Sequence, residues 1–378
     1  MEFRDLKRQY QALKSGIDAA ILAAAGSGTY IMGSSVKELE VELAAYVGVR
    51  HCISCANGTD ALTLALMAWG VGLGDAVFVP DFTFFATAEA AAFLRAEPVF
   101  VDADEATFNM KPEKLEECIK KVIAEGRLVP KTVIPADLFG LPADYVRIRH
   151  VADRYGLLVL EDGAQGFGGS IRGKKVCSFG DISTTSFFPA KPLGCFGDGG
   201  AVFTDSDEWA ERLRSLRSHG QGGDKYDNVY IGMNSRLDTL QAAILLVKLE
   251  AFESELAAVN NAASAYTHRL SGLVTTPAIP PGYTSSWAQY TIITENEAQR
   301  DGLQRHLQQS GIPAMVYYPC PMHRQMAFAN LRYRKCDCTV SQGLCSRVLS
   351  LPMHPYLTEK EIGQVCIAVT DYFDNCQL

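Results

Sequence analysis

A lysine surrounded by apolar and small residues is the first candidate for chemistry in this sequence. Lys191 lies between Thr184-Thr-Ser-Phe-Phe-Pro-Ala and the glycine-rich run Pro-Leu-Gly-Cys-Phe-Gly-Asp-Gly-Gly-Ala. Burial among apolar groups lowers the pKa of a lysine amine and makes it a candidate nucleophile toward a carbonyl carbon. The alternative is a surface lysine in a loop, but the apolar flanks and the lack of neighbouring charge argue against it.

Two more segments place polar groups just after expected strands. Glu-Asp-Gly-Ala-Gln at 161–165 follows the apolar run 157–160, and Asn-Gly-Thr-Asp-Ala at 57–61 follows the run 51–55. A carboxylate at the end of a buried strand needs a partner, and a protonated ring nitrogen is one such partner. Small residues at a helix N-terminus leave N–H groups free to hold a phosphate. Taken singly, an N-cap turn is the better explanation of 57–61, and a helix cap or a structural salt bridge is the better explanation of 161–165.

The elements that would position these residues alternate between apolar runs and helical patterns. Runs that are apolar at every position are typical of strands covered on both faces, and their alternation with helices predicts a parallel α/β sheet. Ligands bind at the carboxyl ends of such strands, so we expect the chemistry there. Strands are expected at 51–55, 76–80, 98–101, 131–135 and 157–160, with helices from 61, 87 and 145.

The C-terminal third of the chain has a different pattern. Apolar residues at three- and four-residue steps after Arg236 predict a long helix, and from residue 252 the pattern changes to a mixed α/β segment. We therefore expect an N-terminal arm and a large domain over 1–251, and a small C-terminal α/β domain over 252–378.

Composition excludes several classes of protein. The 378 residues are 48% hydrophobic and 21% charged with a net charge of -8, which is ordinary globular composition without the basic patch of a nucleic-acid binder. The most apolar stretch, 61–73, is shorter than the ~20 residues that span a membrane, and the N-terminus lacks the apolar core of a signal peptide. We expect a soluble cytoplasmic protein with no nucleic-acid or membrane partner.

The cysteines do not indicate a metal or disulfide framework. Eleven cysteines are scattered along the chain, which suits a reducing compartment. Cys52 and Cys55 have the CxxC spacing but no second pair at zinc spacing, so no metal site is expected.

Together the three segments resemble the fold-type I pyridoxal 5'-phosphate (PLP) enzymes, and within them the DegT/StrS family of nucleotide-sugar aminotransferases. The resemblance covers nearly the whole chain and rests on motifs in family order at 30–40, 58–61, 80–87, 161–165, 186–191 and 232–238. It implies PLP as cofactor and a large PLP-binding domain with a mostly parallel central sheet, followed by the smaller α/β domain.

The resemblance also implies a role for each site residue. Lys191 would hold PLP covalently, and Asp162 would pair with the pyridine nitrogen so that the ring can act as an electron sink. A homodimer with shared sites is implied, in which Asn234 and Arg236 reach the neighbour's site. Gln165 would reach the phenolic oxygen and Phe84 would stack on the ring face. The phosphate would be bound by Gly58, Thr59 and Ser186, together with Asn234 of the neighbour. The substrate would contact Tyr318 and His323 of the same chain and Arg236 of the neighbour.

The reaction that the resemblance implies is transfer of the amino group of L-glutamate to a keto sugar nucleotide. Residues 52–62, 191–194, 234–243 and 351–356 favour C3 of UDP-2-acetamido-2-deoxy-hex-3-uluronic acid, in lipopolysaccharide (O-antigen type) biosynthesis. Amination at C4, or at C3 of another keto-deoxy sugar, is the alternative, since Tyr317 stands before Tyr318 where a histidine is expected. A dehydratase with histidine in place of the lysine, or a non-catalytic regulatory protein, agrees less well with Lys191 and Asp162.

Overall fold

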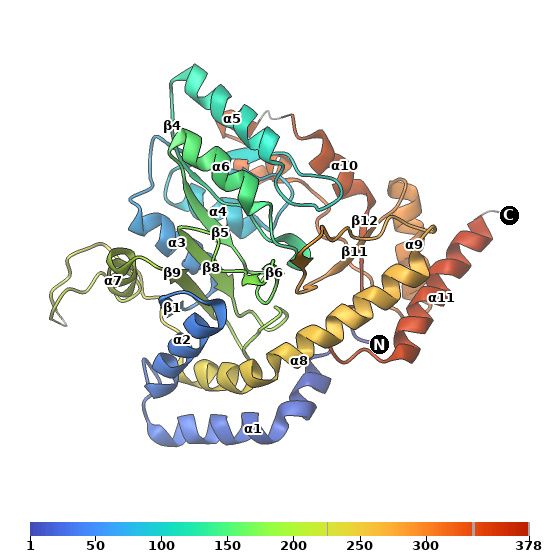
Figure 1. The fold of residues 1–378 in the computed structure, drawn as a ribbon, viewed down its shortest axis with the longest axis horizontal. Coiled ribbons are helices and arrows are strands. Elements are labelled where there is room, and N and C mark those ends of the chain that lie inside the picture. The colour runs from blue at the N-terminus through green and yellow to red at the C-terminus, as the bar shows by residue number, and fades with distance from the viewer. Residues whose placement is uncertain (225, 335–336, 377–378) are drawn as a thin grey trace.

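A seven-stranded sheet forms the centre of the large domain in the computed structural model, which describes residues 1–224, 226–334 and 337–376 (Figure 1). The strand order is β1-β9-β8-β5-β4-β2-β3. The strands are β1 (His51–Cys55), β2 (Asp75–Pro80), β3 (Glu97–Val101), β4 (Val129–Val133), β5 (Leu158–Asp162), β8 (Ile182–Ser186) and β9 (Gly200–Thr204).

The sheet is mostly parallel, as predicted. The pairs β2–β3, β2–β4, β4–β5 and β5–β8 are parallel, and only β9 runs antiparallel, to both β1 and β8. All five predicted strands are confirmed to within two residues, whereas β8 and β9 were not predicted. Two strands differ from their expected ends: β4 covers 129–133 and not 131–135, and β5 continues through Glu161 and Asp162, which both pair with β8.

Helices cover both faces of the sheet, which explains why its strands are apolar at successive positions. On one face α3 (Gly58–Ala68), α4 (Phe85–Phe93) and α7 (Asp207–Leu216) pack over Val77, Val79 and Leu160. On the other face α5 (Pro112–Glu125) and α6 (Tyr145–Tyr155) pack over Phe78 and Val159. Helix α2 (Ser34–Val47) packs at the β1–β9 edge.

Two long helices join the parts of the chain. Helix α1 (Leu6–Ser27) forms the N-terminal arm and packs along α8 (Thr239–Leu270) (Figure 1). Helix α8 runs unbroken through residue 252, the predicted domain boundary. Its first half, through Leu256, packs into a large-domain core, and from Val259 onward it packs into a separate C-terminal core. The predicted boundary therefore falls inside a helix.

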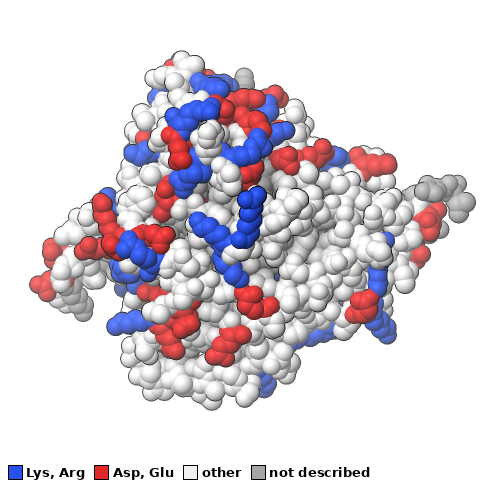
Figure 2. Space-filling model, in the orientation of Figure 1, with Lys and Arg blue, Asp and Glu red and all other residues white. Residues whose placement is uncertain are grey.

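The C-terminal segment is mixed α/β, as its pattern predicts. Strands β11 (Tyr290–Ile293) and β12 (Val348–Leu351) pair antiparallel, and α9 (Glu297–Gln309), α10 (Thr339–Arg347) and α11 (Glu359–Cys376) surround them. No helix within the described ranges is long and apolar enough to cross a membrane. Basic and acidic side chains are interspersed over the face shown in Figure 2.

Candidate active site

Lys191 lies in the loop that joins β8 to β9, residues 187–199, which we call the lysine loop. Its backbone N–H donates to the carbonyl of Phe188 at 2.8 Å, and its Nζ lies 6.0 Å from the centre of the Phe84 ring. Burial lowers the pKa of the Lys191 amine; the Asp162 carboxylate opposes this shift and the Arg4 guanidinium adds to it. The lysine amine is thus biased toward its nucleophilic, uncharged form, as expected from its apolar flanks.

Asp162 ends strand β5 and is 8% exposed. Its Oδ2 accepts a hydrogen bond from Thr87 Oγ1 at 2.8 Å and its Oδ1 accepts from the Ala164 N–H at 3.2 Å. Burial raises the pKa of Asp162, while Thr87, Lys191 and Ala164 act in the opposite direction. Thr87 has no role among the residues named from the sequence; the available signal was its place in the first turns of a helix that follows β2.

The neighbouring carboxylate, Glu161, has a different surrounding. It is fully buried and accepts hydrogen bonds from the N–H groups of Cys177, Phe179 and Gly180 and from Ser183 Oγ, at 2.7–3.1 Å. Successive strand residues point to opposite faces. Glu161 therefore fixes the loop before β8, and Asp162 is the carboxylate left to face Lys191.

Gln165 and Tyr318 close another side of the site. Gln165 Oε1 accepts from the Phe139 N–H at 2.7 Å, and its Nε2 donates to the Tyr318 hydroxyl at 2.9 Å. The Tyr318 ring lies 6.2 Å from that of Phe84, centre to centre. The structure thus brings Gln165, Phe84 and Tyr318 together around Lys191.

The phosphate-binding residues predicted from the sequence meet at one point. Gly58 begins α3, Thr59 follows it, and Asn57 caps the helix by accepting from the Asp60 N–H at 2.8 Å. A Cβ added to Gly58 would lie 2.6 Å from Ser186 Cβ, so only glycine allows this contact. Backbone N–H groups at the α3 N-terminus, with Ser186 beside them, make a cradle that fits a phosphate.

His323 is held by a buried carboxylate. Its Nδ1 lies 2.7 Å from Asp81 Oδ2, and its backbone N–H donates to Asp81 Oδ1 at 2.8 Å. Cys338 brings a third possible metal ligand within 4.8 Å of these groups. Because both Asp81 oxygens already bind His323, we interpret the group as an anchor for the loop that carries Tyr318. A contact between His323 and substrate stays a prediction.

Asn234 and Arg236 lie in the segment that leads into α8. No hydrogen bond or ion pair joins either side chain to Lys191 or Asp162 in the described part of the chain. Asn234 is exposed, and the half-buried Arg236 has an Nε without a hydrogen-bond partner among the described residues. A contribution to a neighbour's site is compatible with this placement and stays a prediction.

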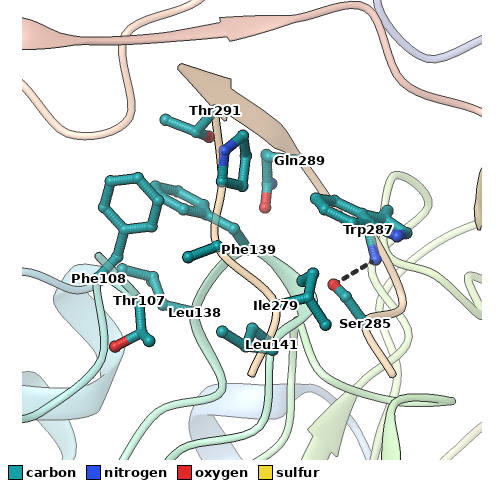
Figure 3. Close-up of a pocket in the computed structure, with 12 residues that line it drawn as sticks. Thr107, Phe108, Leu138, Phe139, Leu141, Ile279, Ser285, Trp287, Gln289 and Thr291 are labelled. Atoms are coloured by element: carbon teal, nitrogen blue, oxygen red, sulfur yellow. Dashed lines mark hydrogen bonds between the residues drawn. The ribbon is translucent and has the colours of Figure 1, made fainter. Parts of the chain in front are cut away.

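A separate apolar pocket, drawn in Figure 3, is too tight to be the reaction site. It lies between the side chains of Phe108, Phe139, Ile279 and Trp287, and its volume is about 10 Å³. A single water needs roughly 10–15 Å³. Phe108, Phe139 and Trp287 all have positive φ angles, of 65°, 58° and 49°. The pocket is a tightly packed apolar contact region that includes Phe139, whose backbone N–H donates a hydrogen bond to Gln165.

The fold and the site define a class: fold-type I PLP-dependent transferases, in which a lysine and a carboxylate face each other at the edge of a mostly parallel sheet beside a phosphate cradle. The chain belongs to the DegT/DnrJ/EryC1/StrS aminotransferase family, whose model matches residues 11–370. It is therefore a PLP-dependent aminotransferase, as the sequence motifs predict.

Relatives and solved structures agree with this assignment. The chain is 46% identical over 374 residues, 98% of its length and 100% of the relative's, to a UDP-2-acetamido-2-deoxy-3-oxo-D-glucuronate aminotransferase of Pseudomonas aeruginosa. A crystal structure of a family aminotransferase from Brucella abortus is 49% identical with a TM-score of 0.96, covering 98% of this chain and 99% of that one. A structure of NtdA from Bacillus subtilis with bound cofactor PMP is 29% identical with a TM-score of 0.88, covering 96% and 82%.

Proposed function

We propose that this enzyme transfers the amino group of L-glutamate to C3 of a UDP-2-acetamido-2-deoxy-hex-3-uluronic acid. The observation that carries the proposal is the placement of Lys191 near enough to the buried Asp162 for the carboxylate to raise the lysine pKa, beside the Gly58–Ser186 cradle. The choice of sugar rests on the Pseudomonas aeruginosa relative, which is named for such a 3-oxo-glucuronate.

Lys191 and Asp162 have different roles in the proposed reaction. PLP, when bound, supplies an electron sink for the carbon that loses its proton. Lys191 would hold the cofactor through its amine and, when freed by the donor, would take the α-proton of glutamate as a general base and deliver it to the cofactor carbon as a general acid. Asp162 would pair with the ring nitrogen of the bound cofactor, and the hydrogen bonds from Thr87 and Ala164 hold its two oxygens in place. The same groups run the sequence in reverse on the keto sugar.

The residues around Lys191 and Asp162 would orient the cofactor. Gly58, Thr59 and Ser186 would hold the phosphate, Phe84 would pack on the ring face and Gln165 would reach the phenolic oxygen. Both ends of the Gln165 amide are already fixed, by Phe139 and by Tyr318. Its direction is therefore set before any ligand binds, and orientation of this kind lowers the barrier by avoiding reorganisation.

An acidic substrate needs local cations in a protein with a net charge of -8. The substrate carries a diphosphate and a carboxylate. Arg236 is half-buried and makes no ion pair with the described residues, so its charge is available to an anion. Tyr318 and His323 contact the sugar on the same side of the site. Amination at C4, or of a sugar without a carboxylate, is the second candidate, because Tyr317 stands where a histidine is expected.

The active unit that we propose is a homodimer with shared sites in the cytoplasm, serving lipopolysaccharide (O-antigen) biosynthesis. The segment that leads to Asn234 and Arg236 extends away from the body of the molecule beyond α7 (Figure 1). It exposes Val229, Tyr230 and Ile231 at 54%, 41% and 91%. Contiguous exposed apolar side chains of this kind favour a protein interface.

A panel of keto sugar nucleotides tests the substrate. The enzyme is incubated with glutamate and 3-keto or 4-keto sugars, each with and without a C6 carboxylate, and the products are identified by mass spectrometry and NMR. We expect the highest kcat/KM for the 3-keto uronate. A higher kcat/KM for a 4-keto sugar would favour the second candidate, and transfer to none of them would contradict the proposed class of substrate.

A further inference from the structure

The N-terminal arm, taken as residues 1–27, contacts the lysine loop directly at two points and indirectly at a third. Arg4 Nη2 donates to the backbone carbonyl of Lys191 at 2.9 Å. The Tyr10 ring packs edge-on against Phe196, with centres 6.0 Å apart. The third contact is indirect and passes through Lys248 of α8. The arm therefore contacts the lysine loop at Lys191 itself and at Phe196.

The indirect contact is a buried polar network. Lys248, 2% exposed, donates to Gln9 Oε1 at 2.8 Å and to the carbonyl of Gly194 at 2.6 Å. Gln9 Nε2 donates to both oxygens of Glu255, and Tyr356 donates to Glu255 Oε1 at 2.6 Å. Buried networks are stabilising when their members are satisfied, and they then hold a single geometry. The network connects the C-terminal segment to the lysine loop through the arm.

The arm also contacts the loop that carries Tyr317 and Tyr318, residues 310–321, which we call the tyrosine loop. The Phe3 ring packs edge-on against Tyr317, with centres 6.0 Å apart, and the Phe3 carbonyl accepts from the Met353 N–H at 3.2 Å. Tyr317 directly precedes Tyr318, which binds Gln165. Phe3 and Arg4, which are adjacent in sequence, thus bridge the tyrosine loop and the lysine loop.

We propose that the N-terminal arm is part of the catalytic apparatus, with Arg4 as a positioning residue that holds the backbone of Lys191 while Phe3 braces the tyrosine loop. The assignment rests on Lys191 being the cofactor-binding lysine. Its geometric part, a cation held against the Lys191 backbone, can be measured independently of the reaction.

The charge of Arg4 adds to this positioning. Burial lowers the pKa of Arg4 to about 10, with Glu255 opposing, so the guanidinium stays charged at neutral pH. The charged groups around the pair are Asp162 beside Lys191, Glu255 and Lys248 from α8, and His354. Arg4 is the cation that lowers the pKa of Lys191, and Asp162 is the anion that raises it. Removal of the Arg4 charge should therefore make the Lys191 amine harder to deprotonate.

The test compares Arg4→Gln, Arg4→Lys and the control Arg8→Gln. Arg8 is also on the arm, but it binds Glu361 and the Tyr356 carbonyl on the exposed side. Reductive methylation of the cofactor-free protein, followed over a range of pH by peptide mass spectrometry, reports the titration of Lys191 itself. A parallel assay of the loaded enzyme separates kcat from KM.

In Arg4→Gln we expect the Lys191 modification midpoint to move to higher pH and kcat to fall about tenfold, with little change in KM. Arg4→Lys keeps the cation, so its midpoint stays near that of the wild type; this variant carries the test if Arg4→Gln does not fold. Any of three results would overturn the proposal. Arg4→Gln could keep the wild-type midpoint and kcat, or Arg8→Gln could show a shift equal to that of Arg4→Gln. The third is a midpoint in Arg4→Lys that rises as much as it would without a cation. A shifted midpoint without any transaminase activity in the wild type would instead contradict the proposed function alone.

Discussion

Gln165 Nε2 donates a hydrogen bond to the Tyr318 hydroxyl at 2.9 Å, which joins the segment after β5 to a loop 153 residues further along the chain. The Gln165 oxygen is held at the same time by the Phe139 N–H. The Gln165 amide therefore has one orientation. It positions Tyr318 from the short segment that follows Asp162.

Removing the Tyr318 hydroxyl should weaken substrate use without unfolding the protein. Tyr318→Phe keeps the ring contacts with Phe82 and Phe84 but leaves Gln165 Nε2 short of an acceptor. A lost buried hydrogen bond costs about 1–3 kcal/mol, so we expect kcat/KM for the sugar nucleotide to fall about tenfold or more. Steady-state kinetics measure it. Tyr317→Phe is the control, and an equal loss there would show that the hydrogen bond to Gln165 is not the cause.

Asp162→Asn should lower turnover and leave the fold intact. The amide keeps the shape of the side chain but cannot stabilise a protonated ring nitrogen, so the electron sink weakens and kcat falls on the order of 10²-fold or more. Stopped-flow absorbance with glutamate measures the rate of the first half-reaction. Unchanged turnover would mean that another group serves the ring.

Glu161→Gln is the matched control on the same strand. Its carboxylate accepts from three backbone N–H groups and one hydroxyl, and an amide NH₂ would meet some of these donors. We expect a loss of about 1–3 kcal/mol in the free energy of unfolding with a much smaller effect on kcat. The reverse pattern, a stable and inactive Glu161→Gln, would contradict the division of roles between the two carboxylates.

Two inactive variants should restore activity when mixed. If Arg236 serves the neighbour's site, a hybrid dimer of Lys191→Ala and Arg236→Ala chains contains one site with both residues intact. A local role for Arg236, such as an ion pair with Asp238 or Glu250, predicts no recovery, and no such pair occurs among the described residues. Mass spectrometry of tagged chains confirms exchange, and hybrids without activity would rule out the shared site.

His354 should make stability depend on pH. It is 2% exposed, and burial lowers its pKa to about 4 from an ordinary 6.5, with Arg4 and Arg8 adding to the shift and Asp5 and Glu361 opposing it. The folded state keeps His354 neutral. Its contribution is therefore complete above pH 6.5 and is lost as the pH falls toward 4, by roughly 3 kcal/mol in total.

Urea unfolding at pH 7 and pH 4 measures this contribution. We expect the free energy of unfolding to fall more in the wild type than in His354→Gln, whose side chain does not titrate. His150→Gln changes an exposed histidine of α6 and should behave as the wild type. Identical losses in the wild type and His354→Gln would contradict the assignment.

Much of this site could be predicted from local sequence because its residues follow strands. Asp162 and Gln165 come at the end of one apolar run and Gly58 after another, and in a parallel sheet these ends share an edge. Lys191 could be predicted as a nucleophilic lysine because its neighbours in the sequence are apolar or small. β8 was missed because Thr184, Thr185 and Ser186 break the apolar pattern that marks a buried strand.

The contacts that depend on distant segments could not be predicted in this way. Arg4 and Lys191 are 187 residues apart, and Asp81 and His323 are 242 apart. No periodicity or spacing links such pairs, because their proximity results from tertiary packing. The domain boundary was obscured for a related reason: α8 has one helical pattern but two different packing partners along its length.

The central claim is that Lys191 is the residue that binds PLP. Borohydride reduction makes a covalent link between a lysine and this cofactor permanent, and peptide mass spectrometry then locates it. We predict that the purified yellow protein, after reduction, carries the cofactor on the peptide containing Lys191, and that Lys191→Ala folds but is colourless and inactive. Cofactor attached to another lysine, such as the buried Lys248, or a yellow and active Lys191→Ala, would contradict the account.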